Sequence, residues 1–374
     1  MTTSGQTTSP ETGPFLDRRT VLLGIGAAAM SPVAWGMPSS ILASRTLSTP
    51  RQTTHYLECG PHDGPLMIFV HGWPAIGLIW NAQMEAFASE GWRCVAPDLR
   101  GYGGSSAPAS HDAYTVKEAV ADMVELHEHL GGKPAIWVGH DWGSPVVGAL
   151  SAHEPRRSRG LVLTSLAYFP EAFALPTLVA LVDRTLYPVD QYPDGQWDYY
   201  RYYTTHFESA VADLDADQAA SLASVYRPGS SAAVGKVSPS ALITRNGGRF
   251  GAAHRAPPTQ ADPNLWPPAD FDVLVKAFSI HGFRTSNAWY LNDDANIAYA
   301  RQAPDGGRLS QPVLYVNGDW DVICSIEGNR QGDPMRAACA DLTVTSLPAG
   351  HWLPLERKAE HIQAIRAWIE AKKL

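Results

Sequence analysis

The stretch Gly139-His140-Asp141-Trp142-Gly143 decides the fold of this 374-residue chain. It follows a short apolar run at residues 135–138, which predicts a strand, and it precedes small residues at 144–153, which predict a helix. A sharp turn between a strand and a helix leaves little space around its central side chain, so glycines are expected on both sides. We therefore predict a nucleophile elbow with Asp141 as the nucleophile.

An aspartate at the centre of this turn indicates a different chemistry from that of a serine. A carboxylate attacks esters and amides poorly, but it can displace a leaving group from an sp³ carbon. The product is an alkyl ester of Asp141, and its hydrolysis by water needs a general base. Because Gly and Asp are also common in ordinary turns, the prediction depends on the rest of the chain.

On both sides of the elbow, short β-rich runs alternate with helical stretches. We predict helices at residues 114–130 and 356–372, and strands at the following ranges: 66–70, 92–97, 160–166, 312–317 and 342–347. Alternation of this kind is typical of an α/β fold in which helices cover a mostly parallel sheet.

The alternation is interrupted by aromatic helical stretches around a Pro-, Gly- and Ser-rich middle at residues 228–268. We interpret residues 169–304 as a mainly helical cap inserted into one core. A separate second domain would leave residues 305–374 with too few strands for a core of their own. The predicted core therefore comprises residues 45–168 and 305–374.

Candidates for the general base and its carboxylate partner lie after the last two predicted strands. Among thirteen histidines, His351 alone occupies the loop between the final predicted strand and the final helix. Two carboxylates, Asp319 and Asp321, follow the strand before it. An acid there would orient the imidazole and stabilise its protonated form.

A second loop bears on the elbow because it follows the strand at residues 66–70. Its sequence is His71-Gly72-Trp73-Pro74. We expect the backbone amides of Trp73 and Trp142 to form an oxyanion hole.

Residues 1–44 are interpreted as an export signal and a disordered segment. Arg18 and Arg19 precede a modest apolar run at residues 25–35, a pattern that resembles a twin-arginine signal for the periplasm or the exterior. The run is too short and weak for a membrane span. An oxidising compartment would permit a disulfide, and Cys324 and Cys339 are the nearer pair in sequence.

The net charge of −8 argues against a nucleic-acid partner, because phosphate binding needs clustered lysines and arginines. The four cysteines show no CxxC motif and no metal-site spacing with histidines. Monomer and homodimer both remain open.

Taken together, the motifs resemble the epoxide hydrolase branch of the α/β-hydrolase superfamily. The resemblance covers about residues 54–374 apart from the middle of the cap. It implies an α/β-hydrolase fold and hydrolysis of a small hydrophobic epoxide without a metal or organic cofactor. The matching motifs are His71-Gly72-Trp73-Pro74, Asp98-Leu99-Arg100-Gly101-Tyr102-Gly103, Gly139-His140-Asp141-Trp142-Gly143, Gly318-x-x-Asp321 and Gly350-His351-Trp352.

The resemblance also implies roles for individual residues. Its G-x-x-D pattern favours Asp321 over Asp319 as the acid. In the family, two cap tyrosines hold the epoxide oxygen, and the matching segments place these roles on Tyr290 and Tyr199. Tyr200 and Tyr203 lie close enough in sequence to Tyr199 to remain alternatives. Substrate contacts are expected from three further motif residues, which are His71, Pro74 and Trp352.

Three other functions compete with epoxide hydrolysis. A haloalkane dehalogenase shares the fold and the nucleophile and would use Trp142 to bind halide, but it usually has an asparagine where Trp73 stands. A haloacid dehalogenase would need arginines just after Asp141, and residues 142–150 contain none. A binding module without activity would be expected to lack one of Asp141, Asp321 and His351.

Overall fold

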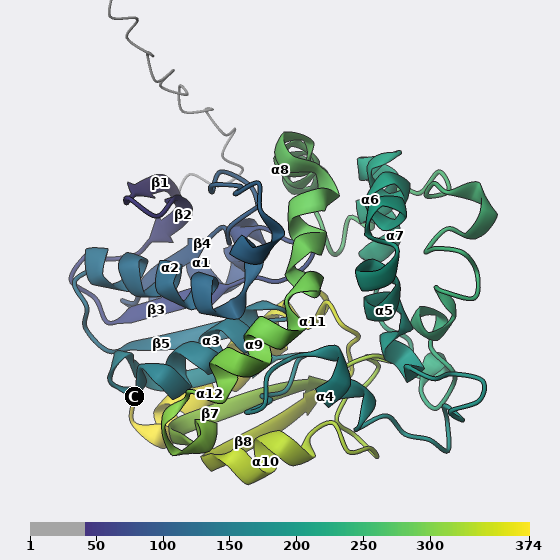
Figure 1. Ribbon diagram of the computed structural model, residues 1–374. Coiled ribbons are helices and arrows are strands. Elements are labelled where there is room, and N and C mark those ends of the chain that lie inside the picture. Colours follow the sequence, from purple (N-terminus) through teal and green to yellow (C-terminus); the bar gives the residue numbers. More distant parts are fainter. Residues whose placement is uncertain (1–41) are drawn as a thin grey trace, which may run out of the picture. The chain divides into compact units, whose positions relative to one another are not determined.

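The computed structural model describes residues 42–374, so the predicted export signal lies outside the described residues. A single sheet with helices around it confirms the predicted α/β fold (Figure 1). The sheet order is β1-β2-β4-β3-β5-β6-β7-β8. The strands are β1 (Ala43–Ser48), β2 (Thr53–Cys59), β3 (Leu66–Val70), β4 (Arg93–Pro97), β5 (Ala135–His140), β6 (Ser158–Thr164), β7 (Leu309–Gly318) and β8 (Cys339–Leu347).

Strands β3 to β8 pair in parallel, whereas β1 and β2 pair antiparallel with their neighbours. The parallel strands β3, β4 and β5 are buried at every position, which is why they are readable as continuous apolar runs. Strand β1 has the mostly exposed sequence ASRTLS. It contains no apolar run, so the sequence did not predict this strand. It begins at Ala43, two residues before the boundary expected at residue 45.

Twelve α-helices belong to the described chain. In Figure 1, α2 and α3 lie in front of the sheet, while α1 packs against α12. Their bounds are α1 (Asn81–Ser89), α2 (Val116–His129), α3 (Gly143–His153), α4 (Leu175–Val179), α5 (Asp198–Thr205), α6 (Phe207–Asp215), α7 (Gln218–Val225), α8 (Pro268–Asn287), α9 (Asp293–Ala300), α10 (Asp333–Ala338), α11 (Leu353–Glu356) and α12 (Lys358–Lys372).

Two predicted helices differ at their ends. Helix α2 begins after Thr115, whose side chain accepts a hydrogen bond from the Glu118 amide and caps the helix. The predicted helix at 356–372 is two helices, α11 and α12, because Arg357 has φ −131° and ψ 52°, outside the helical region.

The insertion between β6 and β7 contains helices α4 to α9, and no strand is formed by residues 165–308. In Figure 1, α5, α6 and α7 stand beside the sheet, on the side to which β7 points. The Pro- and Gly-rich stretch at 228–268 is loop with short 3₁₀ turns. Tyr226 joins the two parts, because its hydroxyl donates to the Pro74 carbonyl at 2.9 Å.

The suggested pairing of Cys324 with Cys339 is wrong. Cys339 lies beside Leu309 at the start of the β7–β8 pair, whereas Cys324 follows the far end of β7. A strand of this length spans ~30 Å, and a disulfide needs Cα atoms within ~7 Å. All four cysteines are buried free thiols.

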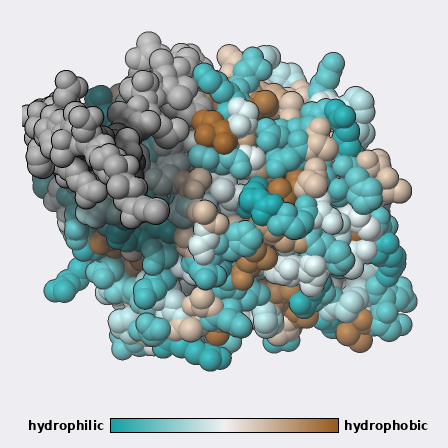
Figure 2. Space-filling view, turned by 45° about the horizontal axis from the view of Figure 1, so that its top comes forward, coloured by the Kyte–Doolittle hydropathy of each residue, from teal (hydrophilic) through white to brown (hydrophobic). Residues whose placement is uncertain are grey.

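The surface shown in Figure 2 is mostly hydrophilic, with scattered hydrophobic residues outside the grey atoms. The exposed large hydrophobic side chains of the described chain, Val189, Val234 and Ile280, are single. Within residues 42–374, every helix is too short or too polar to cross a membrane.

Candidate active site

The predicted catalytic residues follow different strands of the parallel sheet. Asp141 follows β5, Trp73 follows β3, Asp321 follows β7 and His351 follows β8. The carboxyl ends of parallel strands meet at one edge of the sheet, which brings residues far apart in sequence to the same place.

Asp141 occupies a crowded turn between β5 and α3. Its φ is 49°, in the left-handed region that aspartate tolerates better than most side chains. A Cβ atom on Gly143 would lie 2.0 Å from the Val70 carbonyl oxygen, and one on Gly139 would lie 2.7 Å from Gly143 backbone atoms. The two glycines are therefore required by close backbone contacts.

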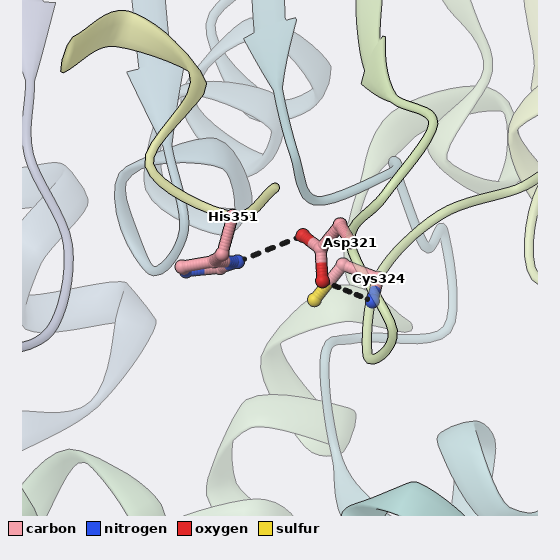
Figure 3. A group of neighbouring side chains, drawn as sticks. All are labelled: Asp321, Cys324 and His351. Atoms are coloured by element: carbon pink, nitrogen blue, oxygen red, sulfur yellow. Dashed lines mark hydrogen bonds and ion pairs between the residues drawn. The ribbon is translucent and has the colours of Figure 1, made fainter. Parts of the chain in front are cut away.

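His351 lies between two carboxylates. Its Nδ1 is 2.9 Å from Asp321 Oδ2, and its Nε2 is 3.5 Å from Asp141 Oδ2. Asp321 also accepts hydrogen bonds at 3.0 Å from the amides of Ile323 and Cys324, which hold its carboxylate in place (Figure 3). Asp319 is half-buried and accepts from Asn317, so it is Asp321 that reaches the imidazole.

Charges around His351 favour its protonated form. Burial disfavours that form, but the charge of Asp321 and the contacts with Asp141 and Asp321 outweigh burial and hold the pKa of His351 well above its ordinary value. Burial would raise the pKa of Asp321, yet the charge of His351 and its hydrogen bond hold it below the ordinary value. The imidazole and Asp321 therefore form an ion pair in the free protein.

The amide of Trp73 donates to Asp141 Oδ1 at 2.6 Å. Gly72 permits this approach, because a Cβ there would lie 2.3 Å from Asp141 Oδ1 and 2.4 Å from the Trp142 amide nitrogen. The Trp73 amide thus holds Oδ1 of Asp141, and Oδ2 is left facing His351, while the Trp142 amide lies on the same side of Gly72.

The tyrosine cluster of the cap separates into residues that face the cavity and residues that do not. Tyr199 and Tyr290 line a cavity of about 920 Å³ together with Asp141 and His351. Their ring centroids are 5.9 Å apart.

Tyr200 instead donates to Asp293 at 2.5 Å, and Tyr203 accepts from Arg249 at 3.0 Å. Of the three tyrosines left open by the sequence, Tyr199 is the one that lines the cavity.

Both cavity tyrosines are held in their neutral form. Burial, followed by nearby acidic groups that include Asp141, holds the pKa of Tyr199 and Tyr290 well above the ordinary value. Neither hydroxyl has a hydrogen-bond partner within residues 42–374. Both can therefore donate a hydrogen bond to a molecule in the cavity.

Trp352 lines the cavity, as expected, but His71 and Pro74 do not. His71 is fully buried, with Nδ1 donating to the Gly72 carbonyl at 2.9 Å and Nε2 accepting from the Leu99 amide at 3.0 Å. Both ring nitrogens are occupied by backbone, so His71 shapes the oxyanion loop and cannot contact a ligand. Pro74 follows a cis peptide bond and contributes its carbonyl to Tyr226.

One group of side chains has the composition of a metal site. Ligand atoms of Asp321, Cys324 and His351 lie within 4.8 Å of one another (Figure 3). Burial, with the charge of Asp321, raises the pKa of Cys324 to about 12, so its thiol is not preformed as a thiolate ligand. The hydrogen bond between His351 and Asp321 also uses the atoms that a cation would need.

Sequence reasoning missed Arg249, which lines the cavity together with Tyr199 and Tyr290. Its guanidinium carbon lies 5.5 Å from the centroid of the Trp73 ring. The residue belongs to the irregular stretch at 228–268, where no periodic pattern indicates which side chains point inward. Its position between Gly248 and Phe250 carries no recognisable motif.

A profile of the α/β-hydrolase fold matches residues 65–358, from the strand before the oxyanion loop to the start of the last helix. The chain belongs to the α/β-hydrolase family. The elbow after β5 and the histidine after β8 are thus placed as this family of enzymes places them.

Named relatives are similar over most of the chain. Epoxide hydrolase A of Mycobacterium tuberculosis is 29% identical over 85% of this chain and 94% of its own length. Bifunctional epoxide hydrolase 2 of Sus scrofa is 25% identical over 89% of this chain, which spans 56% of that protein. Among solved structures, an epoxide hydrolase from an endophytic Streptomyces is 27% identical with a TM-score of 0.72, covering 90% of this chain and 97% of its own.

Proposed function

We propose that this α/β-hydrolase opens epoxides to vicinal diols through an alkyl ester of Asp141. One observation carries the proposal: Asp141, Tyr199 and Tyr290 line the same largely apolar cavity, and neither tyrosine hydroxyl has a partner among residues 42–374. A nucleophilic carboxylate and two neutral donors are the groups that an epoxide needs. The names of the similar proteins support the same reaction.

In the first half-reaction, Asp141 Oδ2 attacks an epoxide carbon and the ring C–O bond breaks. The electron pair of that bond goes to the epoxide oxygen, which takes a proton from Tyr199 or Tyr290. Asp141 Oδ1 accepts from the Trp73 amide, so Oδ2 is the oxygen free to form the new bond. The tyrosines resist ionisation before the substrate binds, which keeps the proton available.

In the second half-reaction, water attacks the carbonyl carbon of the Asp141 ester while His351 accepts its proton. The oxyanion that forms lies at the amides of Trp73 and Trp142. Its collapse breaks the bond between the carbonyl carbon and the ester oxygen, and that oxygen takes the proton that His351 received from water and leaves as part of the diol. Ester formation itself activates His351, because it removes the negative charge 3.5 Å from Nε2 that stabilises the imidazolium. Before water attacks, the imidazolium passes its proton to the tyrosinate left by the first half-reaction, which restores the tyrosine and leaves His351 neutral.

The donors in the cavity favour epoxide over halide as the leaving group. A halide site would use the indole N–H of Trp142, but that group is buried beneath cap aromatic rings, and Trp142 does not line the cavity. The indole N–H of Trp73 already donates to Asn287 at 2.9 Å. The hydroxyls of the two tyrosines remain available to the oxygen of an epoxide.

Parallel incubations with styrene oxide and with bromobutane test the assignment, with diol and bromide as the measured products. We expect diol and no bromide, whereas bromide without diol would show that the protein is a dehalogenase. The His351→Gln variant should accumulate a covalent adduct, because its ester cannot be hydrolysed.

Intact-protein mass spectrometry would detect that adduct as an added mass equal to that of styrene oxide. The Asp141→Asn variant, treated identically, is the matched control and should gain no mass. Equal mass gain in both variants would contradict Asp141 as the nucleophile.

A further inference from the structure

The charges in the active-site cavity are unbalanced. Three arginines, Arg227, Arg249 and Arg255, line it, and Asp141 is the single carboxylate that lines it with them in the described chain. His351 adds positive charge when it is protonated. An aliphatic epoxide without charge would need none of these arginines.

Arg249 packs against two aromatic rings of the site. Its guanidinium lies over the faces of Trp73 and Tyr203, with centroid distances of 5.5 and 6.0 Å. Trp73 is also the residue whose amide holds Asp141. The guanidinium therefore packs against the same residue that contacts the nucleophile.

The hydrogen-bonding capacity of Arg249 is mostly unused. Nε and Nη2 donate to one atom, the hydroxyl oxygen of Tyr203, at 3.2 and 3.0 Å. A guanidinium has five N–H groups in a planar fork that suits a carboxylate. No carboxylate within residues 42–374 pairs with Arg249, in contrast to Arg255, which pairs with Asp217 at 2.8 Å.

We propose that Arg249 binds a carboxylate of the substrate, so that the preferred substrates are epoxides carrying an acid group on an apolar chain. The claim that the substrate is an epoxide rests on the proposed function, whereas the carboxylate site does not. The cavity walls include Ile243, Phe250 and Val225, which suit an alkyl chain. Because Arg249 is half-buried and has no anionic partner among the described residues, an anion that enters the cavity gains both charge pairing and hydrogen bonds.

The test compares terminal epoxides that bear a carboxylate at the end of a short, medium or long alkyl chain with their methyl esters. We expect kcat/KM of the wild-type enzyme to favour the acid over its ester by about 10-fold or more for at least one chain length. In Arg249→Gln this ratio should fall to about one, and Arg249→Lys should retain part of it. Arg245→Gln, an exposed arginine of the same segment that does not line the cavity, should keep the wild-type ratio.

Two results would overturn the proposal: no acid preferred over its ester at any chain length, or equal losses for acid and ester in Arg249→Gln. The second would mean that Arg249 acts on the tyrosines or on the fold. Calorimetric titration with decanoate and decanamide, which contain no epoxide, separates this inference from the proposed reaction. Decanoate should bind about 10-fold more weakly to Arg249→Gln than to the wild type, and equal binding would refute the anion site even if no epoxide is opened.

Discussion

At the scale of single residues, the site depends on which atom of each side chain is already occupied. The Trp73 amide occupies one oxygen of Asp141, and Asp321 occupies Nδ1 of His351. The remaining atoms, Asp141 Oδ2 and His351 Nε2, face each other at 3.5 Å. The hydrogen bonds thus assign a role to each atom before any substrate arrives.

The electrostatic coupling between Asp141 and His351 can be measured directly. Asp141→Asn removes a negative charge that stabilises the imidazolium, so the pKa of His351 should fall from its raised value toward the ordinary range. A pH titration of the imidazole resonances by NMR measures this pKa. Asp319→Asn is the matched control, since Asp319 does not contact His351, and it should leave the pKa unchanged. An unchanged pKa in Asp141→Asn would refute the coupling.

At the scale of elements, the elbow works because β5, α3 and the loop after β3 are in close contact. The sequence predicts Gly139 and Gly143 as parts of a tight turn, but it does not predict which distant residues they contact. The structure shows that Gly143 meets the backbone at Val70, a residue 73 positions earlier in the chain. The same contact places the oxyanion loop beside the nucleophile.

Two glycine substitutions in α3 should therefore differ in cost. In Gly143→Ala the new methyl group meets backbone oxygen at 2.0 Å, which cannot yield without moving β3, so we expect a loss of about 3 kcal/mol or more of unfolding free energy. In Gly148→Ala the nearest atom, at 2.8 Å, belongs to the Tyr168 side chain, and better helix propensity offsets part of the clash. Urea unfolding measures both, and equal losses would contradict this explanation.

At the scale of the whole molecule, several buried histidines link stability to pH. His140 and His361 are fully buried, and burial lowers their pKa values to about 4 and about 3 from 6.5. Below pH 6.5 the unfolded chain takes up protons at these sites while the folded chain does not. The unfolded state then binds more protons, so stability falls as the pH falls.

We expect the unfolding free energy, measured with urea, to decrease from pH 6.5 to pH 5. His351 has the opposite shift, but its contribution changes only above about pH 6.5, where the unfolded histidine loses its proton. Replacing His361 with Gln should reduce the decrease by about 2 kcal/mol, because one fewer histidine is protonated only in the unfolded chain. The same decrease in the variant would show that His361 does not cause it.

The sequence alone predicted the parallel strands of the core and the candidates Asp141 and His351, and the family resemblance added Asp321. These features are local, because Asp141 directly follows the buried apolar strand β5, and His351 lies in the short loop after the last strand, β8. Only the tertiary structure selected Tyr199 among its neighbours, removed His71 and Pro74 from the cavity wall and brought Arg249 into it. The physical reason is that the cap residues reach the site through contacts between distant segments, and the irregular stretch at 228–268 has no periodicity that predicts which side chains point inward.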